Sequence, residues 1–454
     1  MIRFKIYIQN RSLFIDEANL ALNIRERSWL EVFDNLSYEQ FAPPLFLSEI
    51  KLMTTIFGES EYVLRFIPLV VSLLSLWVAW RISKRWLASD LARLFFVGQL
   101  ALSVLMIQYG TEFKQYSSDV FLALALLCLA GEADGSWQKR DLVFWSILGG
   151  FSVWYSMPVV FVLSGIGFYL LAKYRKWSVL IPIFIWLASF ALYYFTILKS
   201  DIQGDYLQTY FENTFLDLSF TKESWAQNGN ILLKMLQATL DKTTVSVVFG
   251  ILVFGLGCWT IITERKEWTF LLLTPILTIL LATAFRYYNL IPRTTLFLQP
   301  FIWLMMAFGI DYVVKHLPRW GQYILLALIL LGLFNKKGHE FLYQKMTFEE
   351  IKPCLIHLNE NGQDHDHLYV HHKAVPAYRY YAHWNRYKCC NVYLGQWDTQ
   401  LAKFYENTEG NIWMLFSHTS EQEAADVIES GDILPERIDD CLSRNVSLYG
   451  YTYQ

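Results

Sequence analysis

Long apolar runs, separated by short polar turns, occupy the chain from residue 63 to residue 334. A helix needs about 20 predominantly apolar residues to cross the hydrocarbon core of a membrane, so runs of this kind predict membrane-spanning helices. We predict about ten complete spans from their number and spacing. They fall at residues 63–80, 91–107, 120–130, 142–155, 159–171, 179–198, 243–262, 268–285, 294–314 and 323–334.

The stretch from residue 142 to residue 171 is too long for one span of about 20 residues and short for two. Lys139 and Arg140 precede it, and Lys173 follows it. Because basic residues collect in cytoplasmic turns, both ends are expected in the cytoplasm with residues 156–158 at an outer tip, which predicts two short helices. The same parity places four segments on the outer side: residues 11–62, 109–118, 199–242 and the region after residue 334.

The first ten residues, MIRFKIYIQN, are only half of what a span needs. Either the chain begins outside the membrane, or a first span is cut short at Met1. We favour a shortened span, because the apolar residues 6–8 end where the polar loop begins.

The region after about residue 346 has the composition of a soluble domain. Residues 347–359 predict a helix despite Pro353, residues 368–371 and 412–416 predict strands, and residues 420–430 predict a helix capped by Ser420. We therefore expect a small α/β domain. It has no glycine-rich phosphate loop, and acceptor docking or a structural cap are both open as its role. The chain divides into residues 1–62, 63–334 and 335–454.

Composition supports a polytopic membrane protein. The 454 residues are 54% hydrophobic and 17% charged, well below the roughly 25% charged residues of soluble domains. The net charge of -3 and the lack of a basic tract with interleaved aromatic residues argue against nucleic acid as a partner.

An adjacent carboxylate pair, Asp16 and Glu17, lies in the first outer loop. A carboxylate there could act as the general base that takes a proton from an acceptor hydroxyl. Alternatively, Asp16 could be the N-cap of a helix that begins at Glu17. The apolar residues between Ala18 and Ile24 could lie along the membrane surface.

A second polar cluster, Glu112, Lys114, Tyr116 and Asp119, follows the span at residues 91–107. Its lysine could hold a lipid phosphate while an acid orients a sugar. The alternative is an ordinary solvated turn between helices.

Three arginines at the outer face have two explanations each. Arg65, in the first turn of its span, could reach the lipid headgroups or bind a phosphate inside a cavity. Arg293 and Arg286 flank another outer turn and could face an anionic substrate or anchor the chain at the interface. The histidine-rich sequence HDHLYVHH lacks acids or cysteines at metal-ligand spacing, so no metal site is expected.

Taken in order, the motifs of the membrane part resemble the bacterial membrane glycosyltransferases related to the protein O-mannosyltransferases (dolichyl-phosphate-mannose-protein mannosyltransferases, glycosyltransferase family 39-like). The ordered set is far more specific than any one motif, and the C-terminal region matches more loosely. One departure is the shortened first span, which is complete in the family. The motifs are Asp16-Glu17-Ala18, Gln40 with Ala42-Pro43-Pro44-Leu45, Glu61-Tyr62-x-x-Arg65-x-x-Pro68, the turn from Glu112 to Asp119, and Pro292-Arg293.

The resemblance implies a GT-C fold, an α-helical polytopic bundle with a long first outer loop and a cavity open to the membrane. It also implies a polyprenyl-phosphate-linked sugar donor, inversion at the anomeric carbon, and transfer to a hydroxyl of a lipid, glycan or protein acceptor. The expected location is the bacterial inner membrane with the C-terminal domain outside the cytoplasm. Neither a metal nor another cofactor is expected.

Carried onto this sequence, the resemblance makes Asp16 the catalytic base, supported by Glu17, and places Arg65 near the donor phosphate. We add Lys114 and Arg293 as further phosphate contacts. The expected substrate-binding residues are Gln40, Glu112, Tyr116 and Asp119.

Two other classes remain as alternatives: a lipid-linked saccharide transporter and a sugar-polymer ligase. The chain shows no internal repeat of its spans and no run of charged residues at mid-membrane depth, which argues against a transporter. The position of the essential charges separates the classes: in the first outer loop for the transferase, in a late outer loop for a ligase, or near mid-span for a carrier.

Overall fold

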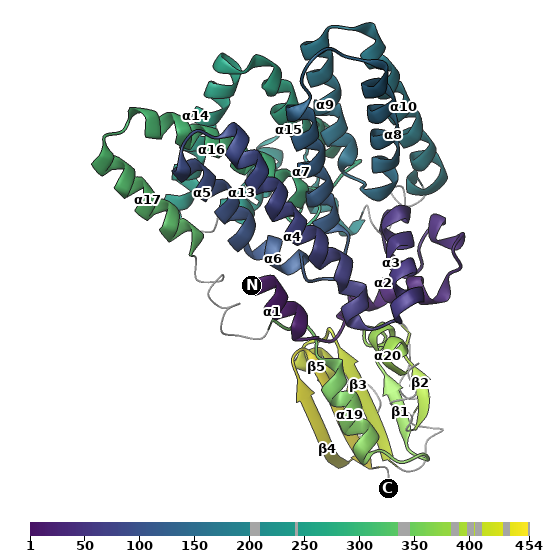
Figure 1. Cartoon of the computed structure of the whole chain (residues 1–454). Coiled ribbons are helices and arrows are strands. Elements are labelled where there is room, and N and C mark those ends of the chain that lie inside the picture. Colours follow the sequence, from purple (N-terminus) through teal and green to yellow (C-terminus); the bar gives the residue numbers. More distant parts are fainter. Residues whose placement is uncertain are drawn as a thin grey trace.

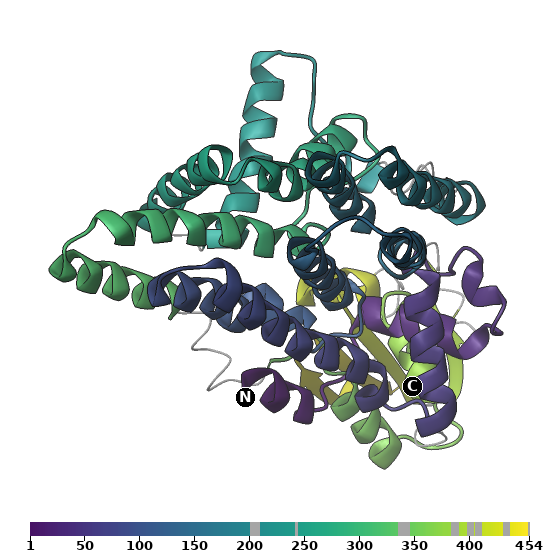
Figure 2. The same cartoon turned by 45° about the horizontal axis from the view of Figure 1, so that its top comes forward.

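A bundle of helices forms most of the molecule, and a small α/β domain lies at one end of the bundle (Figure 1). The computed structural model describes residues 1–199, 209–240, 244–334, 346–382, 390–396, 404, 411–429 and 436–452. In Figure 1 the first helices of the chain lie between the bundle and the α/β domain, and Figure 2 shows them beside that domain in a second view.

The bundle is built from the apolar runs of the sequence. Its helices are α4 (Glu61–Trp86), α5 (Asp90–Leu102), α6 (Val104–Tyr109), α7 (Tyr116–Glu132), α8 (Lys139–Tyr155), α9 (Val159–Tyr174), α10 (Leu180–Tyr193), α14 (Thr244–Glu264), α15 (Lys266–Ala284), α16 (Gln299–His316) and α17 (Arg319–Leu333). Short turns η2 (Trp177–Val179), η3 (Tyr194–Leu198) and η5 (Leu296–Leu298) extend α10 and α16. Outside these runs lie α1 (Ile2–Ile8), α2 (Ile15–Glu26), η1 (Glu31–Phe33), α3 (Pro44–Phe57), η4 (Glu212–Thr214) and α13 (Lys222–Leu240).

Each of the ten predicted apolar runs coincides with helix. The division of residues 142–171 into two helices is confirmed, since α8 ends at Tyr155 and α9 begins at Val159. Within the described residues, five helices are long and apolar enough to cross a membrane: Glu61–Trp86, Trp177–Leu198, Val247–Glu264, Lys266–Ala284 and Leu296–His316. The chain is a multi-pass membrane protein, and the count of about ten spans stays a prediction.

The run at residues 91–107 is interrupted at Ser103, where α5 ends and α6 begins. The guanidinium of Arg3, from the short helix α1, donates hydrogen bonds to the carbonyl oxygens of Leu100 (2.6 Å) and Ala101 (3.0 Å). A helix end leaves carbonyl groups without intrahelical partners. The buried Arg3 therefore supplies hydrogen-bond donors to carbonyl groups at the break between α5 and α6.

Helices α14 and α16 approach each other through glycine. A Cβ atom on Gly257 would lie 1.8 Å from the carbonyl oxygen of Met305, and one on Gly309 would lie 1.9 Å from that of Val253. Small residues permit such close backbone contact between helices in membranes. This contact fixes α16, which follows the turn that contains Arg293.

The C-terminal domain is a five-stranded sheet with helices, as the α/β prediction requires. Its elements are α19 (Ile351–Asn361), β1 (His367–Val370), α20 (Val375–Ala382), β2 (Asn391–Leu394), β3 (Asn411–Ser417), α22 (Glu421–Glu429), β4 (Glu436–Ser443) and β5 (Val446–Thr452). The strand order is β2-β1-β3-β5-β4. Strand β1 is parallel to β2 and β3, whereas β5 is antiparallel to β3 and β4.

The predicted cap of the last helix is confirmed, because the Ser420 hydroxyl accepts a hydrogen bond from the backbone N–H of Glu423 at 3.1 Å. Helix α19 begins at Ile351, later than predicted. Pro353 thereby falls in its first turn, where the missing N–H of proline is tolerated.

Helix α2 does not lie along a membrane surface, so that prediction was wrong. Its apolar residues from Ala18 to Ile24 are at most 2% exposed and form one core with residues of the C-terminal domain such as Leu368 and Trp413. Helix α2 packs against α20 and α3. The polar residues Asn19 and Asn23 of the same helix are buried as well, so protein rather than lipid headgroups surrounds this part of α2.

Candidate active site

Two groups of charged and polar side chains meet at the first turn of α2. We call them the Glu17 cluster (Arg11, Glu17, Arg65 and Glu112) and the Asp16 cluster (Asp16, Gln40, Lys114 and Arg293). The helix begins at Ile15 with Phe14 as its N-cap residue. The alternative in which Asp16 is the N-cap is therefore wrong. Asp16 and Glu17 both lie in the first turn, where the helix dipole favours negative charge.

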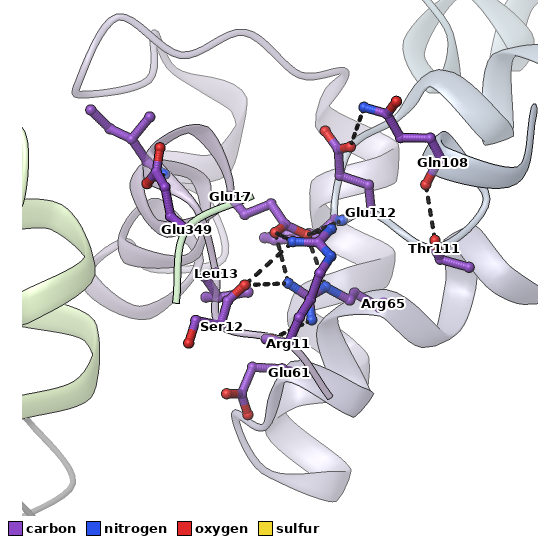
Figure 3. Close-up of polar contacts among 12 residues, drawn as sticks. Arg11, Ser12, Leu13, Glu17, Glu61, Arg65, Gln108, Thr111, Glu112 and Glu349 are labelled. Carbon is purple, nitrogen blue, oxygen red and sulfur yellow. Dashed lines mark hydrogen bonds and ion pairs between the residues drawn. The ribbon is translucent and has the colours of Figure 1, made fainter. Parts of the chain in front are cut away.

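Glu17 is fully buried between two arginines (Figure 3). Its Oε2 atom lies 2.6 Å from Nη1 of Arg11 and 2.7 Å from Nη2 of Arg65. Its Oε1 atom accepts hydrogen bonds from Nε of Arg65 (2.9 Å) and from the backbone N–H of Phe113 (2.7 Å). Burial alone raises the pKa of a carboxyl group, but the positive charges of the two arginines outweigh it and bring the pKa of Glu17 to about 2. Glu17 is thus a link between three segments that is charged at neutral pH.

Arg65 is buried in this cluster and does not reach the surface (Figure 3). Besides Glu17, its guanidinium donates to the carbonyl oxygens of Arg11 (2.8 Å) and Ser12 (3.1 Å). The explanation in which Arg65 extends to the lipid headgroups is therefore wrong. Its role at a donor phosphate stays a prediction, and the observed contacts favour positioning of the first loop.

Glu112, the fourth member of the Glu17 cluster, lies in a turn between α6 and α7 that is buried throughout. The solvated-turn alternative is wrong. Its Oε2 atom accepts a hydrogen bond from Nε2 of Gln108 at 3.2 Å (Figure 3). Burial, followed by the negative charge of Glu17, raises the pKa of Glu112 to about 7, although Arg11 opposes this shift.

The Asp16 cluster is partly exposed to solvent, whereas the Glu17 cluster is buried. Nη1 of Arg293 lies 3.3 Å from Oδ2 of Asp16, and the two side chains are 33% and 31% exposed. The buried Lys114 donates from Nζ to Oε1 of Gln40 at 2.7 Å. Burial lowers the pKa of Lys114, while the negative charge of Asp16 opposes that shift. An acid and two basic groups thus share one partly accessible site.

Tyr116 and Asp119 continue this site along α7. The ring of Tyr116 contacts that of Tyr109 edge to face, with centroids 4.9 Å apart. Asp119 lies about one turn further along the helix and is buried. The structure thus brings the predicted site residues to the same end of the bundle, where Asp16 pairs with Arg293 and both act electrostatically on Lys114.

Several residues of this site were not predicted. Arg11 is the second arginine on Glu17, and Glu349, Tyr381 and His418 of the C-terminal domain contact the first loop or its partners. No spacing in the sequence relates residues more than 300 positions apart. Among the described residues, no group of three or more His, Cys, Asp or Glu side chains is placed to hold a metal ion.

Two solved structures share this fold over nearly the whole chain. ArnT from Cupriavidus metallidurans bound to undecaprenyl phosphate has a TM-score of 0.57 at 11% identity, covering 99% of this chain and 96% of that one. The apo form of the same protein has a TM-score of 0.54 at 12% identity, covering 98% and 96%. Comparison by sequence with curated proteins finds no match. The fold is that of the GT-C membrane glycosyltransferases, as predicted.

Within that class, residues 42–198 match the family model of dolichyl-phosphate-mannose-protein mannosyltransferase. The matched segment is a minority of the chain. It includes Arg65, Glu112 and Lys114, but neither Asp16 nor Arg293. The matched segment is therefore similar to that family, and the whole chain shares the fold of ArnT.

Proposed function

We propose that the chain is an inverting glycosyltransferase that moves a sugar from a polyprenyl-phosphate donor to a hydroxyl acceptor at the outer face of the membrane. The observation that carries this proposal is the Asp16 cluster, in which a partly exposed carboxylate faces a partly exposed guanidinium. The structural likeness to a protein solved with undecaprenyl phosphate supports the choice of donor.

Asp16 is the proposed base. Its carboxylate accepts the proton of the acceptor hydroxyl as the hydroxyl oxygen bonds to the anomeric carbon. The bond between that carbon and the phosphate oxygen breaks, and its electron pair leaves with the phosphate. Attack from the face opposite the leaving group inverts the anomeric carbon without a covalent enzyme intermediate.

Arg293 and Lys114 are the proposed contacts of the leaving phosphate. Positive charge aimed at a group that gains negative charge stabilises the transition state most strongly in a partly desolvated site. Lys114 is buried and oriented by Gln40. When a phosphate engages Arg293, the carboxylate of Asp16 loses its ion-pair partner and becomes available to the acceptor. Glu112, Tyr116 and Asp119 are proposed to contact the sugar.

The Glu17 cluster is the proposed frame of the site. Glu17 ties Arg11, Arg65 and the backbone of Phe113 together. Because α2 carries Glu17 next to Asp16, this frame fixes the position of the base. Glu17 and Arg65 are thus positioning residues in this proposal.

The distribution of charge supports an outer location for the site. Arg81 and Arg85 pair with Glu132 and Asp134 near the end of α4 that lies away from the C-terminal domain (Figure 1). Basic residues favour the cytoplasmic side. We therefore propose that the site and the C-terminal domain, residues 335–454, lie outside the cytoplasm, with the bundle in a bacterial inner membrane.

The test is transfer of label from a radiolabelled polyprenyl-phosphate sugar pool in membranes that contain the chain. Asp16→Asn should abolish transfer while donor binding persists. The matched control is Asp34→Asn, because Asp34 is an exposed carboxylate of the same first loop and should leave transfer unchanged. Wild-type turnover by a folded Asp16→Asn variant would refute the base assignment. Movement of the labelled lipid across the bilayer without a new glycoconjugate would favour the transporter class instead.

A further inference from the structure

The loop that leads to Asp16 is held by the C-terminal domain. The backbone N–H of Leu13 donates to the Tyr381 hydroxyl at 2.9 Å, and the Ser12 hydroxyl donates to Oε2 of Glu350 at 3.1 Å. Lys352 adds contacts from Nζ to the carbonyl oxygen of Asn10 (2.6 Å). These partners lie more than 300 residues along the chain, yet they complete the hydrogen bonds of the first loop.

Among these contacts from the C-terminal domain, the one made by Glu349 lies nearest to Asp16 along the chain. Its Oε2 atom accepts a hydrogen bond from the backbone N–H of Ile15 at 3.1 Å, and Ile15 is the first residue of α2. This N–H is one of the four at the start of a helix that have no intrahelical partner, and the N-cap residue Phe14 has no polar side-chain atom. Glu349 therefore supplies a hydrogen-bond acceptor to the start of α2 from the C-terminal domain. Figure 3 shows Glu349 on the far side of α2 from the arginines.

The same carboxylate joins α2 to the end of β3. Its Oε2 atom accepts a hydrogen bond from the Ser417 hydroxyl at 3.3 Å, and its Oε1 atom lies 2.5 Å from Nδ1 of His418. Glu349 is 4% exposed, whereas the His418 side chain is 56% exposed. A buried carboxylate is costly unless donors and a positive charge compensate it. His418 is the partner that can supply that charge from the solvent side.

The charged groups around this pair come from three elements. Glu349 faces His418 from the segment before α19, Lys373 from the turn after β1, and Asp16 from α2. The hydrogen bond to Glu349 is the largest cause of a raised pKa of His418, with burial and Lys373 opposing and Asp16 adding to the shift. Lys373 is itself paired with Glu423 at 2.5 Å.

We propose that Glu349 and His418 are a positioning pair for Asp16, and that proton loss from His418 loosens the start of α2 and slows transfer. This inference rests on the proposed function of Asp16 as the base. Protonated His418 stabilises the buried Glu349 carboxylate, and that carboxylate holds the N–H of Ile15 directly before Asp16. When His418 is neutral, its hydrogen bond to the Glu349 carboxylate is weaker, and Asp16 is held less firmly.

The test compares pH–rate profiles of transfer in membranes. Wild type should show an alkaline limb above the ordinary histidine pKa, because the pKa of His418 is raised. His418→Asn is chosen because asparagine tolerates the left-handed backbone there (φ 59°). It should lower kcat about tenfold and remove the alkaline limb, with the donor KM within about twofold of wild type.

Two further variants separate charge from structure. Glu349→Gln keeps the shape and an oxygen for the N–H of Ile15, but it removes the charge on which the raised pKa of His418 depends. The alkaline limb should therefore move to lower pH. His418→Arg keeps a positive charge at every pH tested and should retain more activity than His418→Asn at alkaline pH.

The outcomes are distinct from those that test the base. Lower rates with an unchanged pH profile in both His418→Asn and Glu349→Gln would indicate a merely structural role and overturn the pair. If both variants match wild type while Asp16→Asn is inactive, the pair fails and the proposed base stands. If Asp16→Asn is fully active, or if wild type transfers no sugar from any donor of the pool, the proposed function fails and this inference fails with it.

Discussion

Asp16 and Glu17 are adjacent in the sequence but lie in opposite surroundings. Glu17 is sealed between Arg11 and Arg65, and its hydrogen-bonding capacity is used by the protein. Asp16 pairs with Arg293, whose Nη1 atom lies 3.3 Å from its Oδ2 atom, and is partly exposed. Chemically similar side chains therefore differ in accessibility: Glu17 is held inside the protein, and Asp16, the proposed base, is partly exposed. The difference comes from the direction in which each side chain leaves the helix, not from its chemistry.

The sharpest test of this division is loss of the exposed acid. Asp16→Asn should reduce transfer by about 10²–10⁴-fold, the range expected for a general base, while the melting temperature stays close to that of wild type. Activity assays and thermal unfolding in detergent measure the two effects. A large loss of stability would mean that Asp16 belongs to the frame as well.

Loss of the buried acid should act on folding instead. Glu17→Gln leaves Arg11 and Arg65 without a counter-charge, and breaking a buried ion pair from one side costs about 3–5 kcal/mol of stability. Thermal unfolding measures this effect, with Glu39→Gln as a control because Glu39 is an exposed acid nearby in the chain. An unchanged unfolding temperature would contradict the framing role of Glu17.

The basic groups of the Asp16 cluster provide the third test. Arg293→Gln should lower transfer about 10²-fold, comparable to removal of one transition-state donor. Arg286→Gln is the matched control, since Arg286 is exposed near the other end of the same turn. Equal losses in both variants would indicate a membrane anchor rather than a phosphate contact.

The smallest expected effect is the pH dependence of stability, and its sign differs between the two buried acids. The pKa of Glu17 is lowered to about 2 in the folded state, so its stabilisation is present above pH 4.5 and is lost as the pH falls toward 2. The pKa of Glu112 is raised to about 7, so its ionisation opposes folding increasingly as the pH rises from 4.5 to 7.

Glu112→Gln should therefore gain stability relative to wild type as the pH rises through this window and level off above it. Unfolding temperatures measured between pH 4.5 and pH 8 check the difference. Parallel curves for the two proteins would contradict the raised pKa of Glu112.

The bundle could be predicted because its signal is local. A long apolar run specifies a helix wherever it occurs, and the turn at residues 156–158 was located by the charges that flank α8 and α9. The same reasoning failed at α2, because its apolar residues indicate burial but not what buries them. The partner is the C-terminal domain, far away in the sequence.

The residue types of the site were predictable, but their partners were not. Asp16 was expected as the base, and Arg65, Lys114 and Arg293 as phosphate contacts, and these roles stay predictions. Nothing local indicates that Arg11 and Arg65 close on Glu17, or that Glu349 serves the first N–H of α2. Such contacts depend on tertiary packing of segments that the sequence separates.

The contacts between the first loop and the C-terminal domain also set the order in which the site can be completed during synthesis. Leu13 and Ile15 leave the ribosome long before Tyr381 and Glu349, which later accept hydrogen bonds from their backbone N–H groups. Until those residues arrive, the loop lacks partners that its buried backbone requires. A nascent chain can therefore insert its helices while its first loop is still unfinished, and the site becomes complete only when the last domain has folded.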